Sequence, residues 1–389
     1  MRILTVVPYF YPRRGGLEQY AFNIARIMVN RGHEIRVLCN DIESKEEIIE
    51  RIEVVRSKAD FIFSNTPIRL NLACLISQNI TDWKPDLVNA HTPVIYSADV
   101  SAVISRYRKV PFVLTYHNEN VHEQFILNLI ARTYSYTLNL VTLGLSYKII
   151  VASPFSYHES PFIKLFSKKA VWIPPGVNVQ SYTPNKSIYL HQKYRLPHDS
   201  KIALFVGQLS HAHRHKGIDV LLLAFKLVLK EVPDSYLVLI GSGDRVGFYE
   251  CMSEKTGVAK SAIFAGSVAE HELIESYQSA DVVVLPSTSV QEGFGMVLLE
   301  GAACGKPVIG SSIGGIKYFI RDGVDGFAVP LKNERALADA IIKIFRDDNK
   351  GSMMGEAGRE KSKDYDWEIL VDKTETVFRS AVEDKKSIF

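Results

Sequence analysis

Two glutamates flank a glycine-rich turn, and together these residues are the strongest candidates in the sequence for a ligand-binding or catalytic site. Glu292 lies in a polar loop, and Glu300 lies eight residues later in an apolar run. A carboxylate accepts two hydrogen bonds from a vicinal diol, such as ribose or a pyranose offers. Gly293 and Gly295 let the backbone approach a ligand closely, and the free N–H groups of a helix that starts there suit a phosphate. The spacing alone is equally consistent with one capping and one solvated glutamate.

The elements around these glutamates form a strand–helix–strand unit. Residues 281–285 are continuously apolar after an aspartate and stop at Pro286, which predicts a buried strand. A helix is expected over 296–304, and a second strand follows the Gly-Lys-Pro break at 305–307. The loop between them therefore lies at the carboxyl edge of a parallel sheet, where ligands bind.

The segment resembles the EX7E motif of GT4-type retaining glycosyltransferases. The resemblance rests on Glu292 and Glu300 at this spacing, on Gly-Phe-Gly after the first glutamate, and on the strand ending in Pro-Ser before it. It implies that Glu300 holds the ribose of a nucleotide sugar and that Glu292 contacts the transferred sugar. It further implies donor contacts from the residues that follow the first glutamate, namely Gly293, Phe294, Gly295, Met296 and Val297.

The loop over residues 208–217 supplies cations for a diphosphate leaving group. Lys216, followed by glycine, matches the Lys-Gly position of the same family. The sequence departs from the family at Gln208, where an arginine is usual, so Arg214 is expected to supply the second charge. Three alternating histidines would share one side of an extended chain, but without an acidic partner they predict a polar loop and no metal site; these are His211, His213 and His215.

The N-terminal region contains a second glycine-rich turn. A strand over residues 3–7 leads to Gly15 and Gly16, which begin a helix expected over 17–30. Gly16 is a candidate for donor contact, and Arg13, Arg14 and Gly15 are candidates for acceptor contact. The spacing lacks the GxGxxG pattern of dinucleotide-binding domains, and the glycines can equally form an ordinary turn.

Two histidines are expected just past strands of the same region. His91 follows an expected strand over 86–90, and His117 follows another over 111–116. The run Thr-Tyr-His-Asn around His117 resembles the segment in which GT4 enzymes carry a histidine that reaches the donor sugar. A neutral histidine there is expected to donate one hydrogen bond to that sugar. In the second half, the resemblance places the loop around Gly266 against the base.

The order of expected elements predicts an α/β protein, and the resemblance implies the GT-B fold. Two Rossmann-like, doubly wound domains would face a central cleft, with a C-terminal helix crossing back to the first domain. We expect an N-terminal acceptor-side domain over residues 1–185, joined by the returning helix over 366–389. The nucleotide-sugar-binding domain is expected over 186–365, with a linker within 182–199 and one long helical stretch over 123–145.

Composition limits the class of protein. Of the 389 residues, 47% are hydrophobic and 23% charged, which is typical of a globular protein. Four scattered cysteines and the lack of a signal peptide or membrane span predict a cytoplasmic protein. Residues 1–185 carry a net charge of +5 and the remainder −2, which fits peripheral contact with the inner membrane surface, although ordinary charge scatter explains it as well. No nucleic-acid signature accompanies this charge.

The sequence as a whole predicts a retaining hexosyltransferase. The donor would be a GDP- or UDP-linked sugar, the acceptor a sugar or a lipid-linked molecule, and no cofactor or metal is expected. No carboxylate is placed as an obvious nucleophile, so front-face attack is expected, with the departing phosphate taking the acceptor's proton. Two alternatives stay open: a GT-B phosphorylase or epimerase, and a catalytically silent sugar-nucleotide-binding subunit, which Gln208 alone favours.

Overall fold

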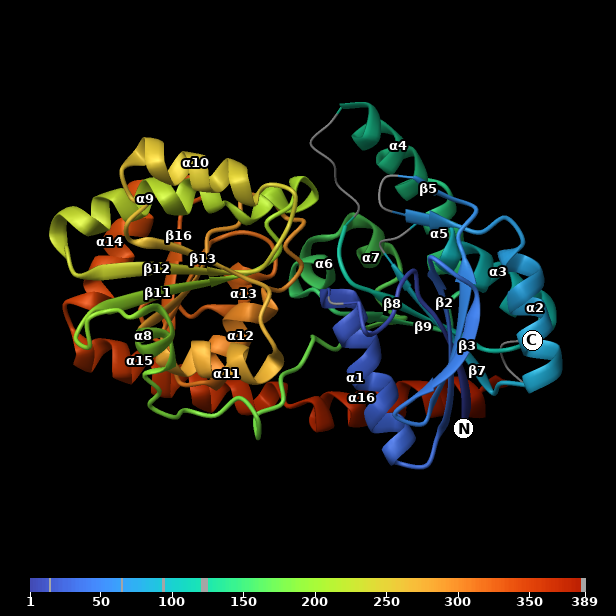
Figure 1. The fold of residues 1–389 in the computed structure, drawn as a ribbon. Helices are drawn as coiled ribbons and strands as arrows, with labels where there is room; N and C mark the ends of the chain where they lie inside the picture. The colour runs from blue at the N-terminus through green and yellow to red at the C-terminus, as the bar shows by residue number, and fades with distance from the viewer. Residues whose placement is uncertain (14, 64–65, 93–94, 120–124, 386–389) are drawn as a thin grey trace. The chain divides into compact units, whose positions relative to one another are not determined.

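The computed structural model describes the chain except for residues 14, 64–65, 93–94, 120–124 and 386–389 (Figure 1). The chain forms two compact units: the first contains residues 1–175 and 367–389, and the second contains 176–366. The boundary precedes residues 176–185, which the sequence analysis assigned to the first domain. These residues join the second unit because Val177 and Tyr182 are buried in its core.

The first unit is built on a mainly parallel sheet, eight-stranded in the part of the chain that is described. Its order is β10-β9-β8-β7-β1-β2-β4-β3, and only β3 is antiparallel to its neighbour. A separate hairpin joins β5 and β6. The strands are β1 (Arg2–Val6), β2 (Glu34–Asp41), β3 (Lys45–Ile49), β4 (Ile52–Lys58), β5 (Phe61–Phe63), β6 (Thr66–Ile68), β7 (Leu87–Thr92), β8 (Phe112–Tyr116), β9 (Lys148–Val151) and β10 (Ala170–Trp172).

Helices pack on both faces of this sheet. α3 contacts β1, β7 and β8 on one face and packs against α2 and α5, whereas α16 contacts β7, β8 and β9 and packs against α1. The helices are α1 (Gly16–Asn30), α2 (Leu72–Trp83), α3 (Ser97–Arg108), α4 (Phe125–Ser135), α5 (Leu138–Leu145), α6 (Pro154–Glu159), α7 (Pro161–Leu165) and α16 (Trp367–Glu383). The helical stretch expected over 123–145 is confirmed over its described part, where it forms two helices, α4 and α5.

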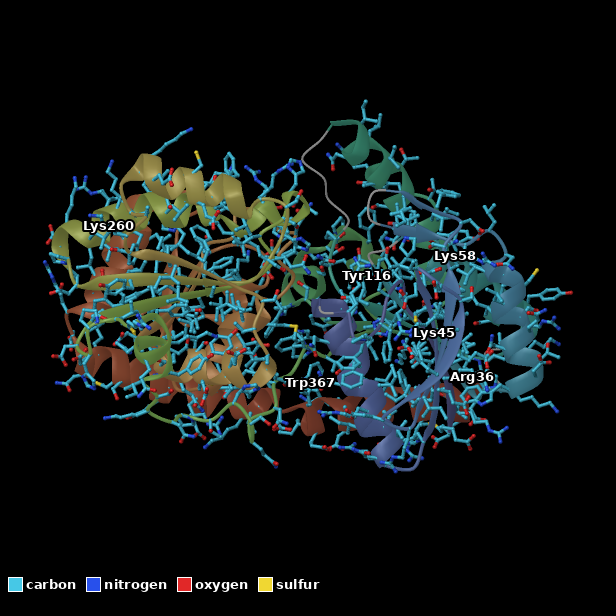
Figure 2. The ribbon with its side chains drawn as sticks, in the orientation of Figure 1. Arg36, Lys45, Lys58, Tyr116, Lys260 and Trp367 are labelled. Atoms are coloured by element: carbon cyan, nitrogen blue, oxygen red, sulfur yellow. The ribbon has the colours of Figure 1, made fainter. Side chains whose placement is uncertain are left out.

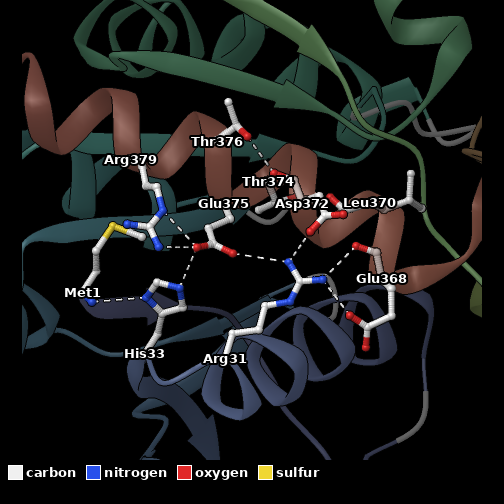
Figure 3. Close-up of polar contacts among 10 residues, drawn as sticks. All are labelled: Met1, Arg31, His33, Glu368, Leu370, Asp372, Thr374, Glu375, Thr376 and Arg379. Atoms are coloured by element: carbon white, nitrogen blue, oxygen red, sulfur yellow. Dashed lines mark hydrogen bonds and ion pairs between the residues drawn. The ribbon is translucent and has the colours of Figure 1, made fainter.

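The last helix, α16, is held to α1 by a network of charges (Figure 3). Arg31, which ends α1, lies 2.6 Å from Glu368, 2.5 Å from Asp372 and 3.3 Å from Glu375. Glu375 Oε1 also lies 3.0 Å from His33 Nε2. Although partial burial opposes its charge, hydrogen bonds from Arg379, His33 and Arg31 lower the pKa of Glu375 to about 2. The C-terminal helix is thereby an integral part of the first unit.

The second unit has a six-stranded, fully parallel sheet in the order β13-β12-β11-β14-β15-β16. Its central strands are buried on both faces, as their continuous apolar sequences predict. The strands are β11 (Lys201–Val206), β12 (Ser235–Ile240), β13 (Ala262–Gly266), β14 (Val282–Leu285), β15 (Val308–Ser311) and β16 (Gly326–Val329).

Helices cover both faces of this second sheet as well. In Figure 1, α9, α10 and α14 lie along one face, and α8, α11, α12 and α15 lie along the other. The helices are α8 (Tyr189–Tyr194), α9 (Ile218–Glu231), α10 (Val246–Thr256), α11 (Glu270–Ser279), α12 (Met296–Ala303), α13 (Ile316–Phe319), α14 (Glu334–Phe345) and α15 (Asp348–Ser362), with 3₁₀ turns η1 (His211–Lys216) and η2 (Lys363–Tyr365). The expected linker over 182–199 is therefore not wholly irregular, since it contains α8. Across the described residues, no helix is long and apolar enough to span a bilayer.

Candidate active site

The second unit collects its candidate residues at the carboxyl ends of β11 and β14. These two strands are neighbours, so the loop after β11, which contains η1, lies beside the loop between β14 and α12. A hydrogen bond of 2.7 Å from the Thr288 amide to the His215 carbonyl joins the two loops. Gly217 allows this approach, because a Cβ there would lie 2.1 Å from the Pro286 carbonyl oxygen and its φ is +72°.

Lys216 and Glu292 form a largely buried ion pair between these loops. Lys216 Nζ lies 2.9 Å from Glu292 Oε2, and the Ser287 hydroxyl donates to the same oxygen at 3.3 Å. The two side chains are 15% and 13% exposed. Burial acts against the charge of Glu292, but Lys216, His215 and the hydrogen bond from Ser287 together outweigh it and lower the pKa of this carboxyl. Glu292 is therefore a carboxylate, and the site holds one cation and one anion in contact.

Glu300 has a different electrostatic environment. It lies on α12, and its Oε2 accepts a hydrogen bond of 2.6 Å from the Tyr277 hydroxyl. Burial raises the pKa of Glu300 to about 7, and the charge of Glu270 adds to this effect, while the hydrogen bond from Tyr277 acts in the opposite direction. Glu300 can thus exchange a proton near neutral pH, which Glu292 cannot.

The glycine turn between the two glutamates leads directly into α12. Phe294 is buried against Phe319 and Tyr365, with ring centroids 5.4 and 5.7 Å away, so it can offer a ligand only its backbone. Gly295 precedes α12 with φ of +84°, a conformation that favours glycine. Met296 and Val297 begin the helix, where backbone N–H groups have no intrahelical partner. The arrangement, together with Gly293, is suited to a phosphate.

The histidine-containing loop differs from the expectation of an extended chain. Residues 211–216 form the 3₁₀ turn η1, so the three alternating histidines do not share one side, and His215 is buried. Arg214 Nη1 lies 2.8 Å from His211 Nε2. Burial, with the nearby charges of Lys216 and His215, lowers the pKa of His213 to about 4. Among the described residues, no three His, Cys, Asp or Glu side chains cluster in a way that could hold a metal ion.

In the first unit, the structure joins the two candidate histidines. His91 Nδ1 lies 2.9 Å from His117 Nε2, and His91 Nε2 lies 3.0 Å from Asn89 Oδ1. His117 follows β8 as expected, but His91 lies inside β7 rather than after it and is only 2% exposed. Burial lowers the pKa of His117 to about 3 and also lowers that of His91, so both rings are neutral at pH 7.

The remaining predicted residues lie near the start of α1 in the first unit and at the end of β13 in the second. Gly15 precedes α1, and Gly16 is its exposed first residue. Arg13 stacks over the Tyr9 ring at 3.6 Å and lies 4.0 Å from Glu18, whereas Arg14 lies outside the described residues. Gly266 ends β13.

Sequence reasoning did not find two further polar residues beside these sites. Asn89 had a usable signal, because it is a polar residue in an apolar strand and shares a strand face with His91. Tyr277 had none, because its contact with Glu300 joins two different helices.

Solved structures with the same overall fold are glycosyltransferases. A sucrose-phosphate synthase from Thermosynechococcus elongatus superposes with a TM-score of 0.80 at 21% identity, covering 98% of this chain and 99% of that one. The Anabaena protein HepE in complex with UDP gives a TM-score of 0.79 at 21% identity, covering 98% and 100%. The chain therefore has the GT-B fold, as predicted.

Family models define the class more closely. The model described as Glycosyltransferase Family 4 matches residues 14–181, and the model described as Glycosyl transferases group 1 matches residues 188–361. The chain belongs to these GT4-type glycosyltransferases and is an enzyme that uses a nucleotide sugar, which confirms the predicted family.

Two named glycosyltransferases are similar in sequence to this chain. The phosphatidyl-myo-inositol mannosyltransferase of Mycobacterium leprae is 27% identical over 391 residues, covering 98% of this chain and 97% of its own. The D-inositol 3-phosphate glycosyltransferase of Corynebacterium urealyticum is 32% identical over 218 residues, covering 54% of this chain and 50% of its own.

Proposed function

We propose that this enzyme transfers a hexosyl group, with retention of configuration, from a nucleoside-diphosphate sugar to a sugar or lipid-linked acceptor. The observation that carries the proposal is the Lys216–Glu292 ion pair in the loop that leads into α12, the helix that carries Glu300. A cation, a carboxylate and free N–H groups in one place match the diphosphate, the sugar and the ribose of such a donor. The family's EX7E pattern supports the same assignment.

In the proposed reaction, the bond from the anomeric carbon to the diphosphate oxygen breaks and a bond to the acceptor oxygen forms. Lys216, with Arg214, stabilises the negative charge that develops on the diphosphate. The acceptor's hydroxyl proton passes to a phosphate oxygen of the departing group, so the step balances without a protein base. Glu292 hydrogen-bonds the transferred sugar, and Glu300 accepts hydrogen bonds from the ribose hydroxyls.

Side-chain cations, rather than a metal ion, are proposed to meet the leaving group. Lys216 is held at the correct edge of the sheet by Glu292, and it becomes available to phosphate when Glu292 turns to the sugar. Activity in the presence of a chelator tests this point directly. Loss of activity on chelation, with recovery on added Mg²⁺ or Mn²⁺, would overturn it.

The donor base is proposed to be uracil or guanine. Related structures have been solved with UDP and with UDP-glucose, and the mycobacterial relative is by name a mannosyltransferase. Incubating the purified chain with UDP-, GDP- and ADP-sugars, and measuring nucleotide release in the presence of a chelator, tests the class and the base together. Glu300→Ala should strongly reduce release at low donor concentration, while Glu334→Ala, at an exposed position on α14, serves as the matched control.

The acceptor is proposed to carry a phosphate or a phospholipid head group. Two of the relatives are named for phosphatidyl-myo-inositol and D-inositol 3-phosphate, and residues 1–185 have a net charge of +5. The helices α4 and α5 and the turn between them expose apolar side chains suited to a lipid surface, which are Ile126, Leu129, Ile130, Tyr136, Leu138 and Val141. We therefore expect peripheral membrane contact through this surface.

Sedimentation with vesicles tests that expectation. Binding to vesicles that contain phosphatidylinositol, and its loss in Leu129→Ser/Leu138→Ser, would support a lipid-linked acceptor. Transfer only to soluble inositol phosphates, without vesicle binding, would identify a soluble acceptor. If the chain binds a nucleotide sugar but transfers to no acceptor and hydrolyses no donor, the silent-subunit alternative replaces the proposal.

A further inference from the structure

A chain of three polar side chains runs through the buried part of the first unit, from β7 to the end of β8. His117 contacts His91, and His91 contacts Asn89, at 2.9 and 3.0 Å. We propose that Asn89 and His91 are positioning residues that fix the tautomer of His117, so that its outward nitrogen accepts a hydrogen bond from a hydroxyl of the donor sugar. The sugar contact rests on the proposed function, whereas the tautomer does not.

The donor and acceptor of each hydrogen bond can be assigned in turn, starting from a backbone carbonyl. The Asn89 side-chain amide donates to the Val113 carbonyl at 2.9 Å and to the Thr115 hydroxyl at 3.0 Å. A carbonyl oxygen can only accept, so the atom of Asn89 that faces Val113 is its nitrogen. The Asn89 oxygen then faces His91 Nε2, which must carry a proton.

The same reasoning continues to His117. A neutral imidazole has one N–H and one bare nitrogen, so a proton on His91 Nε2 leaves His91 Nδ1 as an acceptor. His117 Nε2 must then donate to it, which leaves His117 Nδ1 bare. Among the described residues, His117 makes its only side-chain hydrogen bond to His91. The nitrogen offered to a ligand is thus an acceptor, the reverse of the donor role expected from the sequence.

The surroundings keep both rings neutral and fixed. The Tyr20 ring lies edge-on to His117 at 4.9 Å and to His91 at 6.0 Å, and Trp367 lies 5.5 Å from Tyr20. Figure 2 shows Trp367 at the start of α16. Burial among these rings lowers the pKa of His117 to about 3, so the ring does not take a second proton near neutral pH. A neutral histidine with a set tautomer distinguishes a hydroxyl from a group that cannot donate.

Nitrogen-15 NMR of the histidine side chains tests the tautomer without any substrate. The chain has 11 histidines, and the cross-peaks that disappear in His117→Gln identify the ring in question. We expect His117 to show the Nε2–H pattern across neutral pH in the wild-type chain. In His91→Phe, which removes the acceptor, the pattern should become a mixture of both tautomers. An Nδ1–H pattern or an imidazolium in the wild-type chain would overturn the proposal.

A milder variant protects the test against misfolding. Asn89→Ser keeps a small polar group in β7 but removes the carboxamide that orients His91. It should leave a folded chain, with an unchanged circular dichroism spectrum, in which the Nε2–H preference of His117 is weakened. If both variants fold and His117 keeps its wild-type tautomer in each, Asn89 and His91 do not determine that tautomer.

Donor analogues test the contact with the sugar. Fluorine accepts weakly and cannot donate, so replacing the contacted hydroxyl of UDP-glucose or GDP-mannose by fluorine removes the hydrogen bond to His117. We expect one position on the ring where the loss in kcat/KM, about three- to tenfold, disappears in His117→Phe. Equal losses in both enzymes at every position would overturn the sugar contact. An enzyme that turns over no donor would count against the proposed function, while the NMR result would still decide the tautomer.

Discussion

Two polar clusters lie at carboxyl ends of parallel strands, one in each unit, and they differ in charge. The cluster of Asn89, His91 and His117 is neutral throughout and packs against the ring of Tyr20. The cluster of Lys216 and Glu292 contains two full charges that stabilise each other. In both cases burial is high, so the difference arises from the partners of each group and not from its exposure.

The comparison shows how the same type of sheet can hold two polar clusters of different character. A neutral network with a fixed hydrogen-bond direction is suited to hydroxyl groups and does not attract ions. The lysine of an ion pair can bind a phosphate, since the phosphate only has to replace the carboxylate as its partner. The predictions below separate these two roles.

Removing the cation of the charged cluster should have the largest effect. Lys216→Ala is expected to lower kcat on the order of a hundredfold or more, because the diphosphate charge loses its partner. It also leaves the Glu292 carboxylate buried without its cation, which destabilises the fold. Steady-state kinetics and thermal unfolding measure the two effects.

A double variant separates them. Lys216→Met/Glu292→Gln should recover much of the lost stability, because no charge stays buried alone, but it should not recover turnover. Recovery of turnover in the double variant would mean that Lys216 acts on the fold and not on the leaving group.

The second largest effect is expected at the other glutamate. Glu300→Ala should weaken binding of the nucleotide-sugar donor by about 1–3 kcal/mol, from loss of charged hydrogen bonds to the ribose. Calorimetric titration with the donor gives this value directly. An affinity equal to that of the wild type would remove Glu300 from the ribose site.

The pH dependence of donor binding should follow Glu300 and not Glu292. In the folded chain the pKa of Glu300 is raised from 4.5 to about 7, so folding opposes its ionisation. The folding stability that protonated Glu300 contributes is therefore lost as the pH rises from about 4.5 to 7. Donor hydroxyls favour the carboxylate, so affinity should fall as pH drops below 7, by up to about tenfold per unit. Titrations between pH 5.5 and 8.5 should show this slope in the wild type and a flat profile in Glu300→Gln. A slope that persists in the variant would assign the titration elsewhere.

A smaller effect is expected from the second candidate cation. Arg214→Ala should lower kcat by about tenfold, since Arg214 is proposed to share the diphosphate charge with Lys216. Its contact with His211 makes His211→Ala a suitable control, because that change removes the contact and keeps the cation. A wild-type rate in Arg214→Ala would leave Lys216 as the sole proposed cation of this loop.

The smallest effect concerns the neutral cluster. Arg31→Ala removes three ion pairs and one backbone hydrogen bond with α16 and should lower the free energy of unfolding by about 1–2 kcal/mol, measured by urea denaturation. Because α16 positions Trp367 over Tyr20, the same change should raise the pKa of His117 towards its ordinary value. The exposed pair Arg346–Glu231 in the second unit offers the control, since breaking it should not affect His117.

Much of this architecture could be predicted from the sequence, because it is encoded locally. The apolar run at 282–285, the Gly-Phe-Gly turn and the Gly-Lys-Pro break give the strand, loop and helix that place Glu292 and Glu300. The residues involved are neighbours in sequence. Their elements therefore needed no knowledge of long-range packing.

Other features depend on contacts between distant segments. The loop at 211–216 is a 3₁₀ turn that hydrogen-bonds Thr288 of another loop, which no periodicity reveals. The link between His91 and His117 requires the register of β7 against β8, in which His91 pairs with Thr115. The raised pKa of Glu300 likewise arises from burial on folding, and a spacing rule does not report burial.

The return of the chain to its first unit has a consequence for synthesis on the ribosome. The first sheet is missing a covering helix until α16 has been made, because Val371, Phe378 and Ala381 are buried residues of that helix. At usual rates of translation, on the order of 10–40 s pass while residues 176–366 are added. During that interval the nascent first unit exposes an apolar surface, and the second unit is completed before α16 is made. Chaperone contact is therefore expected to concentrate on the N-terminal half, and a stop codon shortly before α16 should leave the older half of the polypeptide, and not the newer half, prone to aggregation.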